Sequence, residues 1–215
     1  MHLNSELLFR KHAIDSFSDN LKILEIGPSG VPSVYQKVVN NPTLQWDTLD
    51  LYNAHPGITY VSQNEYQYPI SDSAYDIIVC GQVMEHVKMI WAWLKELKRL
   101  VKEGGKIILI NPISWPYHEF PVDCWRIFPE GMRALAEYND LEVIHSEFES
   151  LEANAFAETK TPTIPGQSYT FIDLRKRIAL IKTWNSFIHY LPVIKKLKIP
   201  VEVAYDTLTI YRKRK

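Results

Sequence analysis

Short apolar runs alternate with helical patterns through most of the 215-residue chain. The predicted strands cover residues 21–26, 45–51, 59–62, 75–80, 106–110, 141–145 and 201–211. Helices are predicted between them at 33–40, at 90–101 with its end at Gly104-Gly105, and from Phe128 onward. Strands that are apolar on both faces belong to parallel sheets, and alternation of strands with helices builds such sheets. The sequence therefore predicts an α/β fold with helices on both faces of a mostly parallel sheet.

Composition restricts the class of protein. Hydrophobic residues make up 46% and charged residues 23%, the balance of a globular domain. Lys and Arg total 24 against 25 Asp and Glu, so no basic excess indicates a nucleic-acid partner. The two cysteines lie far apart in sequence, which is typical of reduced thiols. No apolar run has the length of a signal peptide core or of a membrane span, so a cytoplasmic protein is expected.

The charge is distributed unevenly along the chain. Residues 172–215 carry 11 Lys or Arg and 3 Asp or Glu, a net +8, which leaves −9 for residues 1–171. Residues 152–200 separate the last two predicted strands and contain a helical pattern at 172–190. We therefore predict a single domain, 1–215, with 152–200 as a cap or insertion. Three roles for it stay open: a lid over the substrate, a contact between two copies, or a helix on an anionic membrane surface.

Two features follow the first two predicted strands, where parallel sheets bind their ligands. The first strand runs into Glu25-Ile26-Gly27-Pro28-Ser29-Gly30, whose glycines allow a sharp turn and close approach of a ligand. Asp50 ends the second strand, 20 residues after Gly30, where a carboxylate can accept hydrogen bonds from ribose hydroxyls. This spacing fits a dinucleotide or an adenosyl ligand, so a nicotinamide-dependent dehydrogenase is one hypothesis.

A third segment distinguishes the two ligands. It has the sequence Y-P-I-S-D-S-A-Y-D-I-I-V-C-G-Q-V-M-E-H-V at 68–87, followed by a helical pattern, Gly104-Gly105 and an apolar strand. It resembles the small type 11 group of class I S-adenosylmethionine-dependent methyltransferases, whose pattern is roughly L-P-F-x-D-x-S-F-D-x-V-x-x-x-x-V-L-E-H-V. The resemblance covers about residues 21–148 and the last strand. It implies a Rossmann-like seven-stranded sheet with an insertion before the last strand, S-adenosylmethionine as cofactor and S-adenosylhomocysteine as product.

The resemblance also implies cofactor-binding roles for the residues that match its motifs. The family's cofactor loop surrounds the methionine part, an acid after the second strand holds the ribose, and an Asp contacts the adenine amine. Here an Asn stands in that last position with a Glu beside it, and which of the two faces adenine stays open. The usual third glycine of the loop is replaced by Val31-Pro32. The implied cofactor-binding residues are Glu25, Gly27, Gly30, Asp50, Asn64, Glu65 and Gln82.

The segment after the fifth predicted strand is the candidate binding site for the methyl acceptor. The cofactor carries the chemistry of methyl transfer, and the protein aligns the acceptor and removes a proton from a hydroxyl. Residues 111–128 combine prolines and aromatic residues with His118, Glu119, Asp123 and Arg126, a composition that indicates a rigid pocket. The segment resembles the H-x-x-P-x-D-x-W-R-F stretch of some bacterial methyltransferases encoded with surface-polysaccharide genes.

His118 is the predicted general base and Asp123 the second candidate, because an imidazole titrates near neutral pH. His86 is a third candidate and is otherwise a residue that shapes the start of the following helix. The other interpretation of Asp123 and Arg126 is a structural ion pair beside a buried tryptophan. No metal site is predicted. The predicted substrate-binding residues are His86, Tyr117, Trp125 and Arg126.

The sequence as a whole predicts a methyltransferase that O-methylates a sugar or sugar nucleotide in surface-glycan synthesis. One alternative is methyl transfer to a small molecule that bears a phosphate, carboxylate or amine. Another is a non-catalytic subunit that binds the cofactor and a partner.

Overall fold

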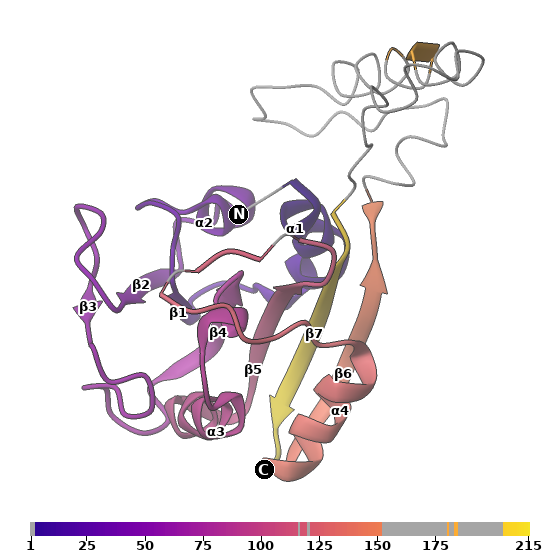
Figure 1. Ribbon diagram of the computed structural model, residues 1–215. Helices are drawn as coiled ribbons and strands as arrows, with labels where there is room; N and C mark the ends of the chain where they lie inside the picture. Colours follow the sequence, from indigo (N-terminus) through magenta and orange to yellow (C-terminus); the bar gives the residue numbers. More distant parts are fainter. Residues whose placement is uncertain (1–2, 116, 120, 152–179, 181–182, 185–203) are drawn as a thin grey trace. The chain divides into compact units, whose positions relative to one another are not determined.

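The computed structural model describes residues 3–115, 117–119, 121–151, 180, 183–184 and 204–215 (Figure 1). The chain divides into two compact units, Met1–Glu149 with Tyr205–Lys215 and Ser150–Ala204. Apart from residues 180 and 183–184, the predicted helix at 172–190 and the predicted 152–200 insertion lie outside the described residues. The fold described below is that of the first unit.

A seven-stranded sheet in the order β3-β2-β1-β4-β5-β7-β6 forms the centre of this unit (Figure 1). The pairs among β1 to β5 are parallel, and β7 runs antiparallel to both β5 and β6. The strand order reverses at β1 and β4, which creates the switch point where such sheets bind ligands. The predicted α/β fold is confirmed. The strands are β1 (Lys22–Ile26), β2 (Gln45–Asp50), β3 (Tyr60–Val61), β4 (Tyr75–Gly81), β5 (Val101–Pro112), β6 (Leu141–Glu149) and β7 (Asp206–Lys213).

Helices cover both faces of the sheet. The apolar stripe of α3 (Ile90–Leu100) packs with α4 (Pro129–Tyr138) in one core cluster, onto strand residues such as Leu24 and Ile78. Neighbouring strand residues, which point to the opposite face, are also buried and need a second cover. That cover comes from the N-terminal segment and α2, whose rings meet at Phe9 and Tyr35 with centroids 4.5 Å apart. The remaining helices are α1 (Leu3–Leu8), η1 (Phe9–Ala13), η2 (Ile14–Ser16), α2 (Val34–Val39) and η3 (Met84–His86).

The N-terminal helices were not predicted, and the expected helix end at Gly104-Gly105 is wrong. Helix α3 ends at Leu100, and β5 begins at once with Val101. Val101 pairs with Tyr75 and Lys106 with Ile77, so the register shifts and the glycines lie in an irregular part of the strand. A Cβ on Gly105 would lie 2.7 Å from the Asp76 carbonyl oxygen. The glycine pair therefore allows a close approach of two strands and does not stop a helix.

Gly81 ends β4 against the ring of Tyr35, which is fully buried. A Cβ at this position would lie 2.0 Å from the Tyr35 hydroxyl oxygen. Overpacking of this kind costs about 1–3 kcal/mol. Gly81→Ala is therefore expected to lower the free energy of unfolding in urea by about 2 kcal/mol, and Tyr35→Phe in the same chain should recover part of the loss. Equal stability of Gly81→Ala and the unmodified chain would contradict this account of the contact.

Candidate active site

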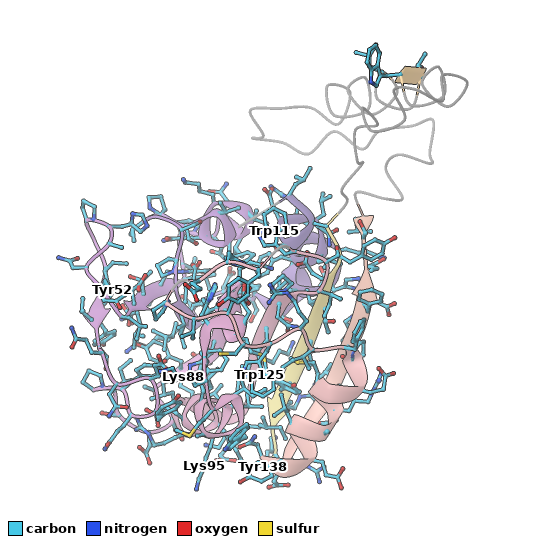
Figure 2. The ribbon with its side chains drawn as sticks, in the orientation of Figure 1. Tyr52, Lys88, Lys95, Trp115, Trp125 and Tyr138 are labelled. Carbon is cyan, nitrogen blue, oxygen red and sulfur yellow. The ribbon has the colours of Figure 1, made fainter. Side chains whose placement is uncertain are left out.

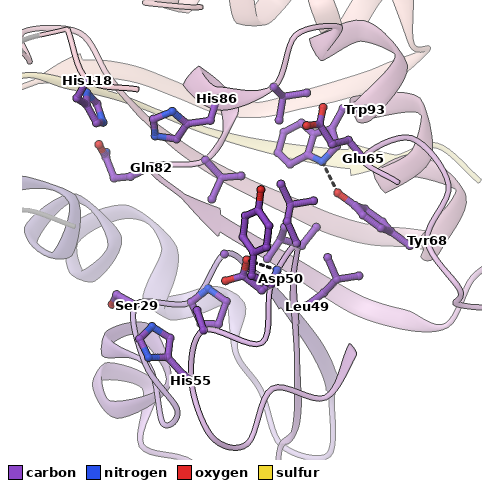
Figure 3. A pocket seen from close by; sticks show the side chains of 18 of the residues that line it. Ser29, Leu49, Asp50, His55, Glu65, Tyr68, Gln82, His86, Trp93 and His118 are labelled. Atoms are coloured by element: carbon purple, nitrogen blue, oxygen red, sulfur yellow. Dashed lines mark hydrogen bonds between the residues drawn. The ribbon is translucent and has the colours of Figure 1, made fainter. Parts of the chain in front are cut away.

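A cavity of about 670 Å³ opens at the carboxyl ends of β1, β2 and β4 (Figure 3). This is the place that the strand order predicts for a ligand, and the volume is that of a small-molecule site. Its wall combines the loops after these strands with the loop after β5. The wall includes Gly27, Asp50, Glu65, Tyr68, Gln82, Val83, His86, Trp115, His118 and Glu119.

Gly27 follows β1 and lines the wall of the cavity. Its φ is +66°, and a Cβ would lie 2.3 Å from Cγ2 of Val83. A side chain at this position is thus disfavoured both by the backbone conformation and by the lack of space. Gly30 lies outside the wall, and a Cβ there would meet nothing within 4 Å among the described residues. Of the two glycines of the loop, Gly27 is therefore the one that lines the cavity.

Glu25 lies below the loop, inside the sheet, and does not line the cavity. Its carboxylate accepts hydrogen bonds from the Ser33 hydroxyl and from Nε1 of Trp46, the latter at 2.9 Å. Ser33 also caps α2, because its oxygen accepts from the Gln36 N–H at 3.0 Å. Glu25 therefore holds the start of α2 in place. Burial raises the pKa of Glu25 from 4.5 to about 7.

The pKa of Glu25 predicts a pH-dependent stability. The native state keeps the proton to about pH 7, whereas the unfolded chain releases it near pH 4.5. The stability due to this group is complete below pH 4.5 and is lost as the pH rises through 7, by about 3 kcal/mol. Glu25→Gln keeps an oxygen that can accept both hydrogen bonds and removes the ionisation. We expect it to match the unmodified chain near pH 4.5 and to be the more stable form at pH 8 by urea unfolding. A difference that does not change with pH would contradict this assignment.

Asp50 ends β2 in the wall of the cavity, and its Oδ1 accepts from the Tyr52 N–H at 3.3 Å. Glu65 also lies in the wall, whereas Asn64 does not. The Asn64 side chain accepts from the Tyr66 N–H at 3.0 Å and so closes its own turn. Of the two residues left open by the sequence, Glu65 is therefore the one that faces the cavity.

Gln82 is held at the floor of the site by residues from both ends of the unit. Its Nε2 donates to the Ser5 hydroxyl at 2.9 Å and to Asp206 Oδ1 at 3.1 Å, and Asp206 Oδ2 accepts from Asn4 at 2.7 Å. Gln82 has a φ of +60°, an uncommon value for a residue other than glycine. Asn4, Ser5 and Asp206 are fully buried and were missed from the sequence. The sequence signal that could have indicated Asn4 and Ser5 is their place as polar residues within the apolar pattern of the N-terminal segment.

His86 and His118 come together at the other end of the cavity (Figure 3). Their rings are perpendicular, with centroids 4.9 Å apart. His86 Nδ1 lies 2.6 Å from the Val122 carbonyl oxygen, which only accepts, so this nitrogen carries the proton and donates it. Burial lowers the pKa of His86. His118 Nδ1 lies 3.4 Å from Asp123 Oδ2, and that oxygen accepts a hydrogen bond from the backbone N–H of His118 at 2.8 Å.

The other predicted residues of this loop lie outside the wall of the cavity. Arg126 Nη1 and Nη2 donate to the two oxygens of Asp123 at 2.5 and 2.7 Å, and this pairing lowers the pKa of Asp123 to about 2. Trp125 Nε1 donates to the Val87 carbonyl oxygen at 2.8 Å. Tyr117 is 72% exposed. The structure thus favours the interpretation of Asp123 and Arg126 as a structural ion pair.

Two other residues of the loop after β5 line the cavity, whereas Tyr117, Asp123, Trp125 and Arg126 do not. Trp115 and Glu119 both line the cavity, and neither was predicted as a site residue. Figure 2 shows Trp115 and Trp125 in different places, although they are ten positions apart in one loop. The sequence pattern shows which loop carries polar and aromatic residues and does not show which of them turn inward.

Comparison with known proteins finds similarity in part of the sequence. Residues 33–109 match the family model of a methyltransferase domain. The match covers less than half of the chain. Together with similar structures solved with S-adenosylmethionine or S-adenosylhomocysteine, the match supports the predicted enzyme, an S-adenosylmethionine-dependent methyltransferase, and the predicted cofactor. None of the curated proteins matches the sequence of the chain. Among the described residues, no helix has the length and apolar character required to cross a membrane.

Solved structures share the fold of this methyltransferase at low sequence identity. A proposed methyltransferase from Bacillus halodurans is 18% identical over the whole of both chains, with a TM-score of 0.60. An S-adenosylmethionine-dependent methyltransferase from Archaeoglobus fulgidus is 16% identical over 97% of this chain and 92% of its own, with a TM-score of 0.58. Phosphoethanolamine N-methyltransferase 2 of Haemonchus contortus, solved with S-adenosylmethionine, is 14% identical over 99% of this chain and 53% of its own, with a TM-score of 0.57. These identities establish the fold and leave the methyl acceptor undecided.

Proposed function

We propose that the chain transfers the methyl group of S-adenosylmethionine to a hydroxyl of a sugar or sugar nucleotide. One observation carries the proposal: a single cavity has Gly27 and Asp50 at one end and His86 and His118 at the other. The first pair suits a nucleoside cofactor, and the second pair suits a hydroxyl that must lose a proton.

In this proposal the cofactor binds at the carboxyl ends of the strands. Asp50 accepts hydrogen bonds from the ribose hydroxyls, and the side of the cavity near Glu65 receives the adenine. The methionine part lies along Gly27 and Gln82, which both line the cavity. The sulfonium methyl group then faces the imidazoles. Glu25, Gly30 and Asn64 act through the shape of their own segments, because their side chains or Cβ positions are turned away from the wall.

The acceptor end favours a neutral acceptor. Among the described residues, the wall carries no lysine or arginine, and Glu119 contributes a carboxylate. The side chains by themselves therefore disfavour a reacting phosphate or carboxylate here through like charge. The Trp115 ring offers an apolar surface to the carbon face of a sugar, and Glu119 can accept hydrogen bonds from its hydroxyls. The ionised Asp123 orients His118 and is not the base in this proposal.

The reaction context is the synthesis of surface glycans. The resemblance of the segment from His118 to Phe128 to methyltransferases of polysaccharide synthesis supports it, as does a neutral acceptor site. Contact with a membrane surface or with a second copy was predicted for residues 152–200, and these two partners are proposals that rest on the sequence.

The test is a methyl-transfer assay with the full chain and methyl-labelled S-adenosylmethionine. The acceptors are neutral sugars, sugar nucleotides, sugar phosphates, sugar acids and amines. We expect label in the products of neutral hydroxyls, with equal amounts of S-adenosylhomocysteine. Label only on phosphates, carboxylates or amines would contradict the proposed acceptor. Cofactor binding without S-adenosylhomocysteine formation with any acceptor would favour the non-catalytic subunit.

A further inference from the structure

Glu85 carries a buried carboxylate beside the two imidazoles of the cavity. The residue is fully buried, and neither carboxylate oxygen has a hydrogen-bond partner among the described residues. Its Oε1 lies 3.7 Å from Nε2 of His86. A buried carboxylate without a partner is costly, and proteins compensate such groups with a proton, a cationic side chain or a metal ion. Burial raises the pKa of Glu85 to about 8, so the carboxyl keeps its proton when no cation is close, and its surroundings show which cation could replace that proton.

The surroundings of Glu85 have the composition of a metal site. One ligand atom each from Glu85, His86 and His118 lies within 4.8 Å of the other two. The nearby positive charge of Arg126 is paired with Asp123 at 2.5 Å, and so is already compensated. The Cys124 N–H donates to the Glu85 carbonyl oxygen at 2.7 Å, which holds the loop of His118 against the turn that carries Glu85.

The histidines also have the outer contacts that metal ligands require. In metal sites the second ring nitrogen of a histidine usually donates to a carbonyl or carboxylate. His86 Nδ1 donates to the Val122 carbonyl oxygen at 2.6 Å, which turns its Nε2 lone pair towards Glu85. His118 Nδ1 lies 3.4 Å from the Asp123 carboxylate, and Arg126 fixes that carboxylate in turn. A hydrogen bond thus orients the His86 ring from behind, and a carboxylate lies near Nδ1 of His118.

We propose that Glu85, His86 and His118 bind a divalent transition-metal ion such as Zn²⁺, Co²⁺ or Mn²⁺ at the acceptor end of the cavity. Two imidazoles and one carboxylate suit these ions and leave coordination positions open. Since both histidines line the cavity, an open position can receive the acceptor hydroxyl. This inference rests on the proposed function and names the way in which the acceptor is activated, although no metal site was predicted from the sequence.

The metal ion would act as a Lewis acid in methyl transfer. The acceptor hydroxyl binds the ion through its oxygen, which makes the hydroxyl more acidic, and its proton passes to water. The oxygen then forms the new bond to the methyl carbon, and the carbon–sulfur bond breaks. Its electron pair stays on the sulfur, which gives the methyl ether and S-adenosylhomocysteine.

The binding test uses the full chain, treated with a chelator and then titrated with Co²⁺, whose visible absorption reports its coordination. We expect one Co²⁺ per chain, displaced by Zn²⁺. Glu85→Gln and His118→Ala should each weaken binding by more than the 10–100-fold that is typical of outer contacts. Glu130→Gln is the matched control, because this glutamate is exposed on α4, and it should bind Co²⁺ like the unmodified chain. Because His118 is more exposed than Glu85, His118→Ala keeps the test open if Glu85→Gln does not fold.

Absence of Co²⁺ binding, or binding that His118→Ala leaves unchanged, would overturn the metal site. A second measurement separates this failure from failure of the proposed function. The metal-free chain should transfer methyl groups at least 100-fold more slowly and recover with Zn²⁺, Co²⁺ or Mn²⁺. An unchanged rate without metal would overturn the role of the metal and leave the proposed function standing. Stoichiometric Co²⁺ binding without methylation of any sugar would support the metal site and refute the proposed function.

Discussion

Replacing Asp50 with alanine is expected to weaken binding of S-adenosylmethionine by about 100-fold or more. Asp50 lies in the wall of the cavity at the end of β2, where a carboxylate can accept from both ribose hydroxyls. Hydrogen bonds to a charged group contribute about 1.5–3 kcal/mol each, so the loss of two accounts for this change. Isothermal titration with S-adenosylmethionine measures it directly.

The matched control for Asp50→Ala is Asp15→Ala, because Asp15 is exposed on the N-terminal segment and away from the wall. It should bind S-adenosylmethionine like the unmodified chain, and both variants should keep the circular dichroism of the folded domain. Equal affinities of Asp50→Ala and Asp15→Ala would show that the ribose is held elsewhere.

Replacing His118 with alanine is expected to lower kcat by about 100- to 10,000-fold, because His118 promotes loss of the acceptor proton, either as the base or as a ligand of the proposed metal ion. The imidazole lines the acceptor end of the cavity beside His86. Because Asp50 and Gly27 lie at the other end, the affinity for S-adenosylmethionine should stay within about threefold. Steady-state kinetics with the sugar that the acceptor assay identifies provides the measurement.

The control for His118→Ala is Tyr138→Ala, which removes an exposed ring on α4 and should leave kcat unchanged. A His118→Ala chain that keeps its kcat and raises only KM would reduce His118 to a residue that binds the acceptor. Loss of affinity for S-adenosylmethionine in the same variant would instead show that the imidazole contacts the cofactor and not the acceptor.

The fold could be predicted from the sequence because its signals are local. Apolar runs such as 75–80 identify buried parallel strands by themselves, and the spacing from Gly27 to Asp50 places both residues at the same edge of the sheet. Gly104-Gly105 shows the limit of a local rule. A glycine pair after a helical pattern ordinarily ends a helix, but here the strand begins earlier and the glycines serve its contact with β4.

The candidate site could be predicted only in part, because the direction of a side chain depends on distant partners. Glu25 belongs to the expected cofactor loop, yet its carboxylate accepts a hydrogen bond from Trp46, 21 residues away, and lies inside the sheet. Gln82 is fixed by Ser5 and Asp206, which lie 77 and 124 positions from it. In the loop after β5, Arg126 binds Asp123 and leaves His118 in the wall of the cavity.

The central claim is that this cavity binds S-adenosylmethionine through Gly27 and Asp50, and calorimetry of the full chain tests it most directly. The spacing of the glycine loop and Asp50 fits either an adenosyl ligand or a dinucleotide. Titrations with S-adenosylhomocysteine and with NADH distinguish these two. We predict one S-adenosylhomocysteine per chain, loss of that binding in Asp50→Ala, and no heat with NADH. Binding of NADH together with no binding of S-adenosylhomocysteine would contradict the account.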